Sequence, residues 1–283
     1  AQPPHEFLEL GHLLHEQRLF KSRDEVRLMQ RAAEISVRAH EAAMRAARPG
    51  IHEYELQAEI ERVFRAADAW PAYGTIVGAG ANACVLHYVA NRARARDGDL
   101  VLVDAGAEYR GYAADITRTF PAGGRYTKEQ RALHDLVGAA QAAALERARP
   151  GVPFAALHEA AVMTLTEGLL RLGLLRGGLE KNVAEGHYKR FYRHKSGHWL
   201  GLDVHDVGDY RIDGESRLLE PGMVLTIEPG LYVPPDDTTV AAKWRGIGIR
   251  TEDDVLITAD GHRVLTEGLA RSAEEIEAFM VAR

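Results

Sequence analysis

The clearest pattern along the chain is a pair of amphipathic segments. The first is predicted to be a helix that begins at Ser22, because Ser22-Arg23-Asp24-Glu25 has the form of a capping box, and that ends at Pro49-Gly50. A second helix is predicted to follow at once, with Leu56, Ile60, Val63 and Phe64 at helical spacing. Each helix therefore presents an apolar stripe to a core.

The same order of elements occurs again later. Thr127-Lys128-Glu129-Gln130 is another capping box, and its helix ends at Pro150-Gly151 before a further amphipathic segment. Both stops have the sequence Ala-Arg-Pro-Gly, a match that favours an internal duplication although Pro-Gly is a common terminator. Strand-rich stretches follow each helix pair, at about 74–120 and 197–258. We therefore predict an α+β fold in which two related halves, 22–120 and 127–258, pack their helices on one side of a curved antiparallel sheet.

Two aspartates flank a predicted hairpin in the first half. The apolar run 100–103 leads into Asp104 without alternation, as in a strand buried on both faces, which opposes the alternative that both aspartates face solvent. If the turn centres on Tyr109 and Arg110, Asp104 lies opposite Asp115 with Cβ atoms about 5 Å apart. Two such charges repel unless a cation lies between them, so the hairpin indicates a metal centre.

The duplication predicts a counterpart hairpin in the second half, and 224–228 with 247–252 provides one. Glu228 ends the first of these strands, before Pro229-Gly230. Glu252 has an alternative interpretation as part of a solvated acidic run, Glu252-Asp253-Asp254. Its spacing from Arg250 places both side chains on one face, where the guanidinium could hold a carboxylate.

Histidines gather between 194 and 208. His198 follows Gly197 and heads an apolar segment, so its ring can point into a cleft. His205 would lie more than about 20 Å away along a straight strand, so the two could share a metal only if the chain bends, which Gly201 permits. His87 is a third candidate. Four carboxylates with one imidazole favour a pair of manganese or cobalt ions, about 3.5–4 Å apart as in many hydrolases, over a structural zinc.

Composition narrows the class of protein. The 283 residues are 46% hydrophobic and 27% charged, and the net charge of −6 argues against nucleic-acid binding as the main function. We expect no membrane span and see no signal peptide, although the chain begins at Ala1, which suggests an excised piece. The single Cys84 excludes an intrachain disulfide, fits a reducing cytoplasm and is interpreted as a small apolar filler rather than a nucleophile. Residues 1–21 and 176–196 lack periodicity and are predicted to be linker or loop.

In order along nearly the whole chain, these motifs resemble the pita-bread metallopeptidases, and within them the Xaa-Pro aminopeptidases of the aminopeptidase P group. The resemblance rests on the segments 18–22, 74–78, 86–88, 103–106, 115–121, 198–208, 228–232 and 246–254. It implies a pita-bread catalytic domain over 22–283, preceded by a linker over 1–21, and the absence from this chain of the family's N-terminal domain. A homo-oligomer is left open.

The resemblance also implies roles. Asp104, Asp115, His198, Glu228 and Glu252 would hold two metal ions, usually manganese with cobalt or zinc as alternatives, and Asp115 and Glu252 would bridge them. Glu228 would also carry a proton from a metal-activated water towards the leaving proline nitrogen. His87 and His205 would bind the peptide substrate and stabilise the oxyanion, and Arg250 would orient a ligand. The alternative for His205 is a buried histidine paired with Asp206.

Three rival functions follow from the same motifs. A prolidase shares the fold and all five ligands but cleaves Xaa-Pro dipeptides. A methionyl aminopeptidase matches the length, but its motifs fit less well. A binding module that has lost catalysis should have lost ligands, whereas all five positions are kept here. The expected activity is therefore hydrolysis of the bond between an N-terminal residue and a following proline.

Overall fold

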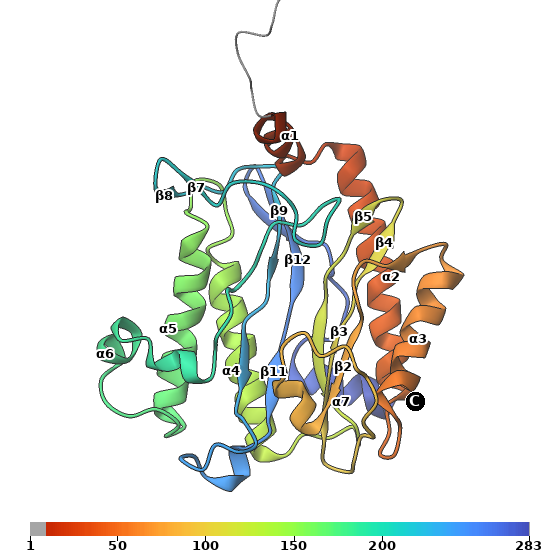
Figure 1. Ribbon diagram of the computed structural model, residues 1–283, viewed down its shortest axis with the longest axis vertical. Coiled ribbons are helices and arrows are strands. Elements are labelled where there is room, and N and C mark those ends of the chain that lie inside the picture. The colour runs from red at the N-terminus through yellow and green to blue at the C-terminus, as the bar shows by residue number, and fades with distance from the viewer. Residues whose placement is uncertain (1–9, 283) are drawn as a thin grey trace, which may run out of the picture.

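Two helix pairs flank the strands in the computed structural model of the chain, which describes residues 10–282 (Figure 1). The first pair is α2 (Arg23–Ala46) and α3 (Glu53–Ala66), and the second is α4 (Lys128–Leu145) and α5 (Ala155–Arg171). Both predicted capping boxes are formed, at Ser22 with Glu25 and at Thr127 with Gln130. The helix starts were therefore correctly predicted from local chemistry.

Each half contains one long antiparallel hairpin. In the first half β3 (Leu100–Asp104) pairs with β6 (Thr117–Pro121), and the hairpin continues into β4 (Ala107–Tyr109) and β5 (Tyr112–Ala113). In the second half β9 (Val224–Ile227) pairs with β12 (Asp253–Thr258), and β10 (Gly230–Tyr232) pairs with β11 (Gly248–Arg250). The remaining strands are β1 (Trp70–Pro71), β2 (Ile76–Ala79), β7 (Arg211–Ile212), β8 (Glu215–Ser216) and β13 (Gly261–Val264).

The two halves repeat one pairing order. In the first, β2 pairs with β3, which pairs with β6. In the second, the segment 198–200 takes the place of β2, because Leu200 N–H donates to Val224 O and Thr226 N–H donates to His198 O. Helix pair, short strand and long hairpin thus occur twice. This arrangement confirms the expected α+β pita-bread fold of two pseudo-symmetric halves.

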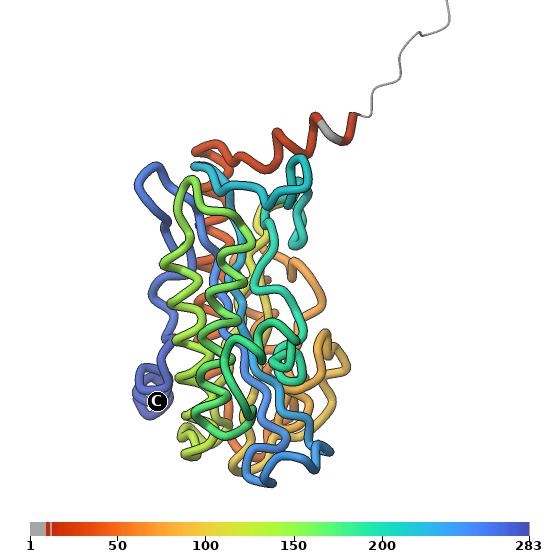
Figure 2. The backbone as a smooth tube through the Cα atoms, turned by 90° about the vertical axis from the view of Figure 1, so that its left-hand side faces the viewer, coloured from red at the N-terminus to blue at the C-terminus, as the bar shows by residue number. Residues whose placement is uncertain are grey.

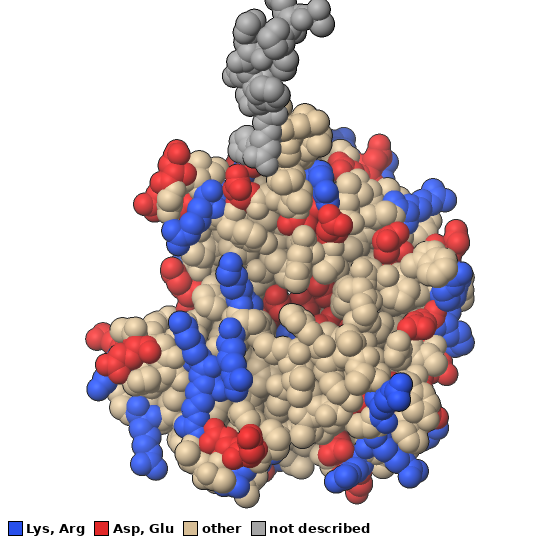
Figure 3. Space-filling model, in the orientation of Figure 1, with Lys and Arg blue, Asp and Glu red and all other residues tan. Residues whose placement is uncertain are grey.

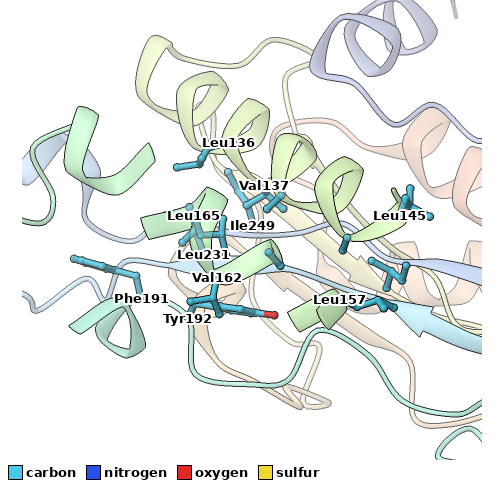
Figure 4. Packing of buried hydrophobic residues seen from close by; sticks show 14 of the residues in the cluster. Leu136, Val137, Leu145, Leu157, Val162, Leu165, Phe191, Tyr192, Leu231 and Ile249 are labelled. Atoms are coloured by element: carbon cyan, nitrogen blue, oxygen red, sulfur yellow. The ribbon is translucent and has the colours of Figure 1, made fainter. Parts of the chain in front are cut away.

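The helices and the long loops lie on opposite sides of the strands. Figure 2 shows α4, α5 and α7 (Ala273–Val281) on one side and the loops around residues 80–95 and 190–215 on the other. Apolar side chains from α4, α5, β10 and β11 fill the space between helices and sheet in the second half, among them Val137, Leu165, Leu231 and Ile249 (Figure 4). A matching cluster joins α2, α3 and α7 to β2, β3 and β6. Each such buried side chain contributes about 1.5–3 kcal/mol.

The register of the first hairpin differs from the prediction by two residues. The turn centres on Arg110 and Gly111, both with positive φ (52° and 88°), so Tyr109 pairs with Tyr112 and Asp104 pairs with Thr117. The predicted pairing of Asp104 with Asp115 was therefore wrong. A two-residue hairpin turn of this type needs left-handed backbone at both central positions, and Gly111 adopts it at low cost. A shift by two keeps every side chain on its face, so Asp115 still shares the face of Asp104.

The segments predicted as linker or loop contain short helices. Residues Leu10–Leu19 form α1, Leu179–Ala184 form α6, and a 3₁₀ turn spans His187–Arg190. Tertiary contacts stabilise α1, because Leu19 is buried and Glu16 forms an ion pair with Arg217. The domain boundary at residue 22 stays a prediction, and residues 1–9 of the predicted linker lie outside the described residues. Within 10–282, no helix is long and apolar enough to span a membrane.

Candidate metal centre

Both long hairpins are interrupted at their middle. The first breaks at 105–106 and 114–116, and the second breaks at 228–229 and 251–252. Asp104 ends β3, and Asp115 lies in the first break. In the second break, the pairs Ile227–Asp253 and Gly230–Arg250 place Glu228 opposite Glu252. Three carboxylates, Asp115, Glu228 and Glu252, thus lie in the breaks, and Asp104 lies directly before one of them.

A direct backbone contact brings the two breaks together. Glu252 N–H donates to the carbonyl of Thr117 at 3.0 Å, and Arg118 Nη1 donates to the carbonyl of Glu252 at 2.7 Å. Arg118 is itself buried in an ion pair with Asp253, Nη2 to Oδ1 at 2.7 Å. The three residues Glu252, Asp253 and Asp254 are all buried, so the interpretation of this segment as a solvated acidic run was wrong.

All of the predicted site residues line one cavity of about 550 Å³: Asp104, Asp115, His198, Glu228, Glu252, His87, His205 and Arg250. Figure 3 shows it as a hollow near the centre of the loop side, with acidic atoms at its floor. Ligand atoms of Asp115, His198 and Glu252 lie within 4.8 Å of one another. His198 Nε2 lies 3.4 Å from Asp115 Oδ2 and 4.0 Å from Glu228 Oε1.

The ring of His198 is oriented by its other nitrogen. Nδ1 lies 2.9 Å from the carbonyl of Trp199, so it is the protonated nitrogen and donates to that oxygen. Nε2 is then left facing the carboxylates with its lone pair available whenever the ring is neutral. A backbone carbonyl that fixes the tautomer in this way is typical of histidine metal ligands.

The chain does bend between His198 and His205. Asp206 N–H donates back to Trp199 O at 2.9 Å, and the two histidine rings lie with their centroids 4.2 Å apart. Gly201 lies inside this bend, where a Cβ atom would come within 2.1 Å of Asp206 Oδ2. The alternative of a buried His205 paired with Asp206 was wrong, since His205 is exposed and the carboxylate of Asp206 binds Arg18 and Lys21.

Arg250 contacts three groups around the cavity. Its Nη2 forms an ion pair with Asp104 Oδ2, its Nε donates to Thr117 Oγ1 at 3.0 Å, and its Nη1 donates to Tyr232 OH at 2.9 Å. Nε lies 3.9 Å from Glu252 Oε2. Arg250 therefore holds a carboxylate, as its spacing suggested, but the carboxylate that it holds most closely is Asp104.

Without cations, the carboxylates of Asp104, Glu228 and Glu252 hold protons more tightly than usual. Burial raises the pKa of Asp104 to about 6 against the opposing charge of Arg250, and it raises the pKa of Glu228 to about 8 against His198 and Arg250. Burial and the charge of Asp115 raise the pKa of Glu252 well above its usual range. Burial alone would lower the pKa of His198, but the hydrogen bond and charge of Asp115 outweigh it and raise that pKa to about 9.

Two residues near the metal centre were missed by sequence reasoning. The hydroxyl of Tyr73 lies 2.6 Å from Asp104 Oδ1 and 2.5 Å from Asp115 Oδ1, and it can donate its one proton to either oxygen. His194 lies 3.5 Å from Glu228 Oε2 and 2.9 Å from the hydroxyl of Tyr232. Tyr73 precedes β2 in a segment with no pattern of its own. His194 stands in the noted histidine cluster, which was the one available signal.

Cys84 lies outside the cavity lining. It is partly buried, and its thiol donates to the carbonyl of Val233 at 3.4 Å. Burial raises the pKa of this thiol to about 12, so little thiolate forms near neutral pH. This agrees with the interpretation of Cys84 as a small filler.

Residues 27–259 match the family model of metallopeptidase family M24. The chain is 49% identical over 271 residues to the Xaa-Pro aminopeptidase of Escherichia coli, covering 95% of this chain and 61% of the relative. A solved aminopeptidase of Pseudomonas aeruginosa is 57% identical, with a TM-score of 0.98 over all of this chain and 64% of that one. Escherichia coli aminopeptidase P in complex with substrate is 49% identical, with a TM-score of 0.93 over 96% of this chain and 61% of that one.

The chain thus spans less than two thirds of the length of these relatives. The matched residues include both helix pairs, apart from the first turn of α2, and both interrupted hairpins. They also include every residue that lines the cavity. From this match, the chain belongs to metallopeptidase family M24.

Proposed function

We propose that the cavity binds two divalent metal ions and hydrolyses the peptide bond between an N-terminal residue and a following proline. The observation that carries this proposal is the convergence of four carboxylates and one imidazole at the two hairpin breaks. The Xaa-Pro aminopeptidases among the relatives support the choice of substrate. The cytoplasmic location expected from the single cysteine, and any oligomer, remain predictions.

The donor set fits such a metal pair. The carboxylates line one cavity together, and desolvation with mutual repulsion raises the pKa values of Asp104, Glu228 and Glu252. Divalent cations would replace the protons and relieve that repulsion. Carboxylate oxygens with one imidazole suit manganese, cobalt or zinc, and we propose manganese as the resident metal. A zinc-substituted Escherichia coli aminopeptidase P in complex with product, 48% identical with a TM-score of 0.96, makes metal identity a matter for direct measurement.

Within this proposal, the five ligands divide between the two ions. Asp115 and Glu252 would serve both ions, Asp104 would hold one, and His198 with Glu228 would hold the other. Bound divalent ions would lower the pKa of a water molecule towards neutrality and supply the nucleophile. Arg250 keeps Asp104 in place through their ion pair, and the Tyr73 hydroxyl lies within hydrogen-bond distance of Oδ1 of both Asp104 and Asp115.

Side chains that line the cavity carry out the remaining steps in this proposal. Glu228 has a partly buried carboxylate beside His198 and His194, and in this proposal it takes the proton of the attacking water. It then delivers that proton to the proline nitrogen as the peptide bond breaks. His87 and His205 lie on the rim, where each can donate a hydrogen bond to the substrate carbonyl as negative charge develops on its oxygen.

The test compares two substrates. The purified chain is stripped with a chelator, reloaded with Mn²⁺ and assayed on an Xaa-Pro-Yaa tripeptide and on the matching Xaa-Pro dipeptide. We expect metal-dependent release of the first residue and a preference for the tripeptide. Faster cleavage of the dipeptide would identify a prolidase instead. Metal binding without cleavage of either peptide would favour a binding module.

A further inference from the structure

The loop that carries His205 has few internal supports. Between Trp199 and Asp206 it forms no helix or strand, and Leu202, Asp203 and His205 are exposed. Four backbone bonds hold it: Leu200 N–H to Val224 O, Gly201 N–H to Asp203 O, Asp206 N–H to Trp199 O, and Ala113 N–H to Gly201 O, at 3.0, 3.1, 2.9 and 2.8 Å. A loop with so little buried surface opens readily unless a further contact secures it.

The further contact is a buried carboxylate. The side chain of Asp206 has no exposed surface, and it meets two cations, Arg18 from the last turn of α1 and Lys21 from the segment that joins α1 to α2. Lys21 Nζ lies 3.1 Å from Asp206 Oδ2 with its own side chain 1% exposed, and Arg18 forms an ion pair with Oδ1. Arg18 also lies 2.7 Å from Asp203 Oδ2, so this one guanidinium binds two residues of the loop, Asp203 and Asp206.

The Lys21 side of this contact is fixed independently of the loop. Lys21 N–H donates to Gly222 O at 2.8 Å, and Nζ also donates to the carbonyl of Leu19 at 3.4 Å. The loop closes tightly around the ion pair, because a Cβ atom on Gly201 would meet both Asp206 Oδ2 and Lys21 Cε, at 2.1 and 2.9 Å.

A buried ion pair is weak evidence for stability, because the desolvation of two charges offsets most of their attraction. Its best-attested use is to specify one conformation. Here the conformation in question is the bend that places the ring of His205 4.2 Å from that of His198.

We propose that Asp206, held by Lys21 and Arg18, is a positioning residue that fixes His205 at the rim of the metal centre. Its effect on catalysis rests on the proposed function, whereas its effect on the loop does not. If Asp206 acts through His205, its removal costs activity only while His205 is present.

The test is a double-variant cycle with Asp206→Asn, His205→Ala and their combination, each loaded with Mn²⁺ and assayed on an Xaa-Pro-Yaa peptide. We expect Asp206→Asn to lower kcat/KM at least about tenfold, since misplacement by about 1 Å can cost 10²-fold. We expect no further loss when it is added to His205→Ala. Equal losses in both backgrounds would overturn the proposal. Glu16→Gln is the matched control, because it weakens the Glu16–Arg217 ion pair of the same helix without touching this loop.

Hydrogen exchange of the amides of 200–205 gives a readout that needs no activity. We expect faster exchange there in Asp206→Asn than in the parent or in Glu16→Gln. Unchanged exchange would also overturn the proposal. Arg18→Gln, at a partly exposed position, provides a milder variant if Asp206→Asn does not fold, and it should show the same effect to a smaller degree. If the unmodified chain is inactive but the variants show the expected exchange pattern, the proposed function is rejected and the positioning role of Asp206 stands.

Discussion

Thr117 and Glu252 join the two halves of the molecule at the metal centre. The carbonyl of Thr117 accepts from Glu252 N–H at 3.0 Å, and its hydroxyl donates to Glu252 Oε2 at 2.7 Å. The same hydroxyl accepts from Arg250 Nε at 3.0 Å. A residue of the first hairpin thus orients a proposed bridging ligand of the second.

This contact predicts the effect of Thr117→Val, which keeps the side-chain shape but removes the hydroxyl. The carboxylate of Glu252 would lose its orienting donor, and we expect metal affinity to fall by about 10–100-fold, as is usual for the partners of metal ligands. Titration of the stripped protein with Mn²⁺ by calorimetry measures this directly. Thr164→Val is the control, because Thr164 bonds only within its own helix, to Ala160 O. Equal metal affinities for the two variants would contradict the prediction.

Glu228→Gln is expected to abolish measurable turnover. The residue is assigned both a metal bond and the proton transfer, and general acid–base groups alone contribute roughly 10²–10⁴-fold. Arg250→Ala should retain residual activity and measurable metal, because Arg250 acts on Asp104 through an ion pair. Metal content and turnover of an Xaa-Pro-Yaa peptide are measured on both variants. Full activity of Glu228→Gln would shift the proton transfer to a histidine.

Local chemistry was enough to predict much of this site. The strand ends at Asp104 and Glu228 and the capping boxes at Ser22 and Thr127 are set by residues close in sequence. The error in the first hairpin came from placing the turn at Tyr109 instead of at the left-handed pair Arg110-Gly111. Moving the turn by one residue shifts the strand pairing by two. A shift by an even number leaves each side chain on its face of the sheet, so the face of Asp115 was still predicted correctly.

The remaining features depend on contacts between distant parts of the chain. The bend at Gly201 is stabilised by Lys21, which lies 180 residues earlier in the numbering. Tyr73 reaches Asp104 and Asp115 only because β2 pairs with β3. The helix α1 lacks periodicity and is anchored by the ion pair of Glu16 with Arg217. No local pattern could have indicated these contacts.

Glu53→Gln should disturb the loop that carries His87. The buried Glu53 carboxylate accepts from two backbone amides, Ala79 and Ala93, at 2.8 Å each, and from the side chains of Asn82 and Tyr88 at 2.9 and 2.8 Å. These contacts flank His87, whose φ of 56° is unfavourable for a residue with a side chain. The side-chain amide introduced by Glu53→Gln would point its NH₂ group at hydrogen-bond donors. The lost hydrogen bonds would lower the free energy of unfolding by about 1–3 kcal/mol.

We therefore expect Glu53→Gln to raise KM for an Xaa-Pro-Yaa peptide while leaving metal content unchanged, because Glu53 lies outside the metal centre. Glu55→Gln is the matched control, since Glu55 is partly exposed on the same helix and caps it at His52. Steady-state kinetics and metal analysis of the two variants decide the matter. A rise in KM of the same size in both would assign the effect to the helix rather than to the loop.

Above pH about 6.5, the metal-free protein is expected to lose stability as the pH rises. In the folded state the pKa of Glu228 is raised to about 8 by burial, and that of His198 to about 9 by Asp115, which outweighs burial. Both groups then hold protons that the unfolded chain has released, so the free energy of unfolding falls through this interval. The buried His40 and His134, with pKa values lowered to about 4 by burial, act in the opposite direction only below it.

Bound metal should reverse this trend, because divalent ions bind the deprotonated ligands and their affinity increases with pH. The midpoint of thermal unfolding is measured from pH about 6.5 to about 9, once in chelator and once in excess Mn²⁺. The difference between the two midpoints should increase as the pH rises. Glu228→Gln lacks one of the titrating groups, so its midpoint in chelator should depend less on pH than that of the parent. A metal-free midpoint that rises with pH in this interval would mean that the cavity carboxylates are already ionised without a cation, and that their convergence is stabilised by some other group.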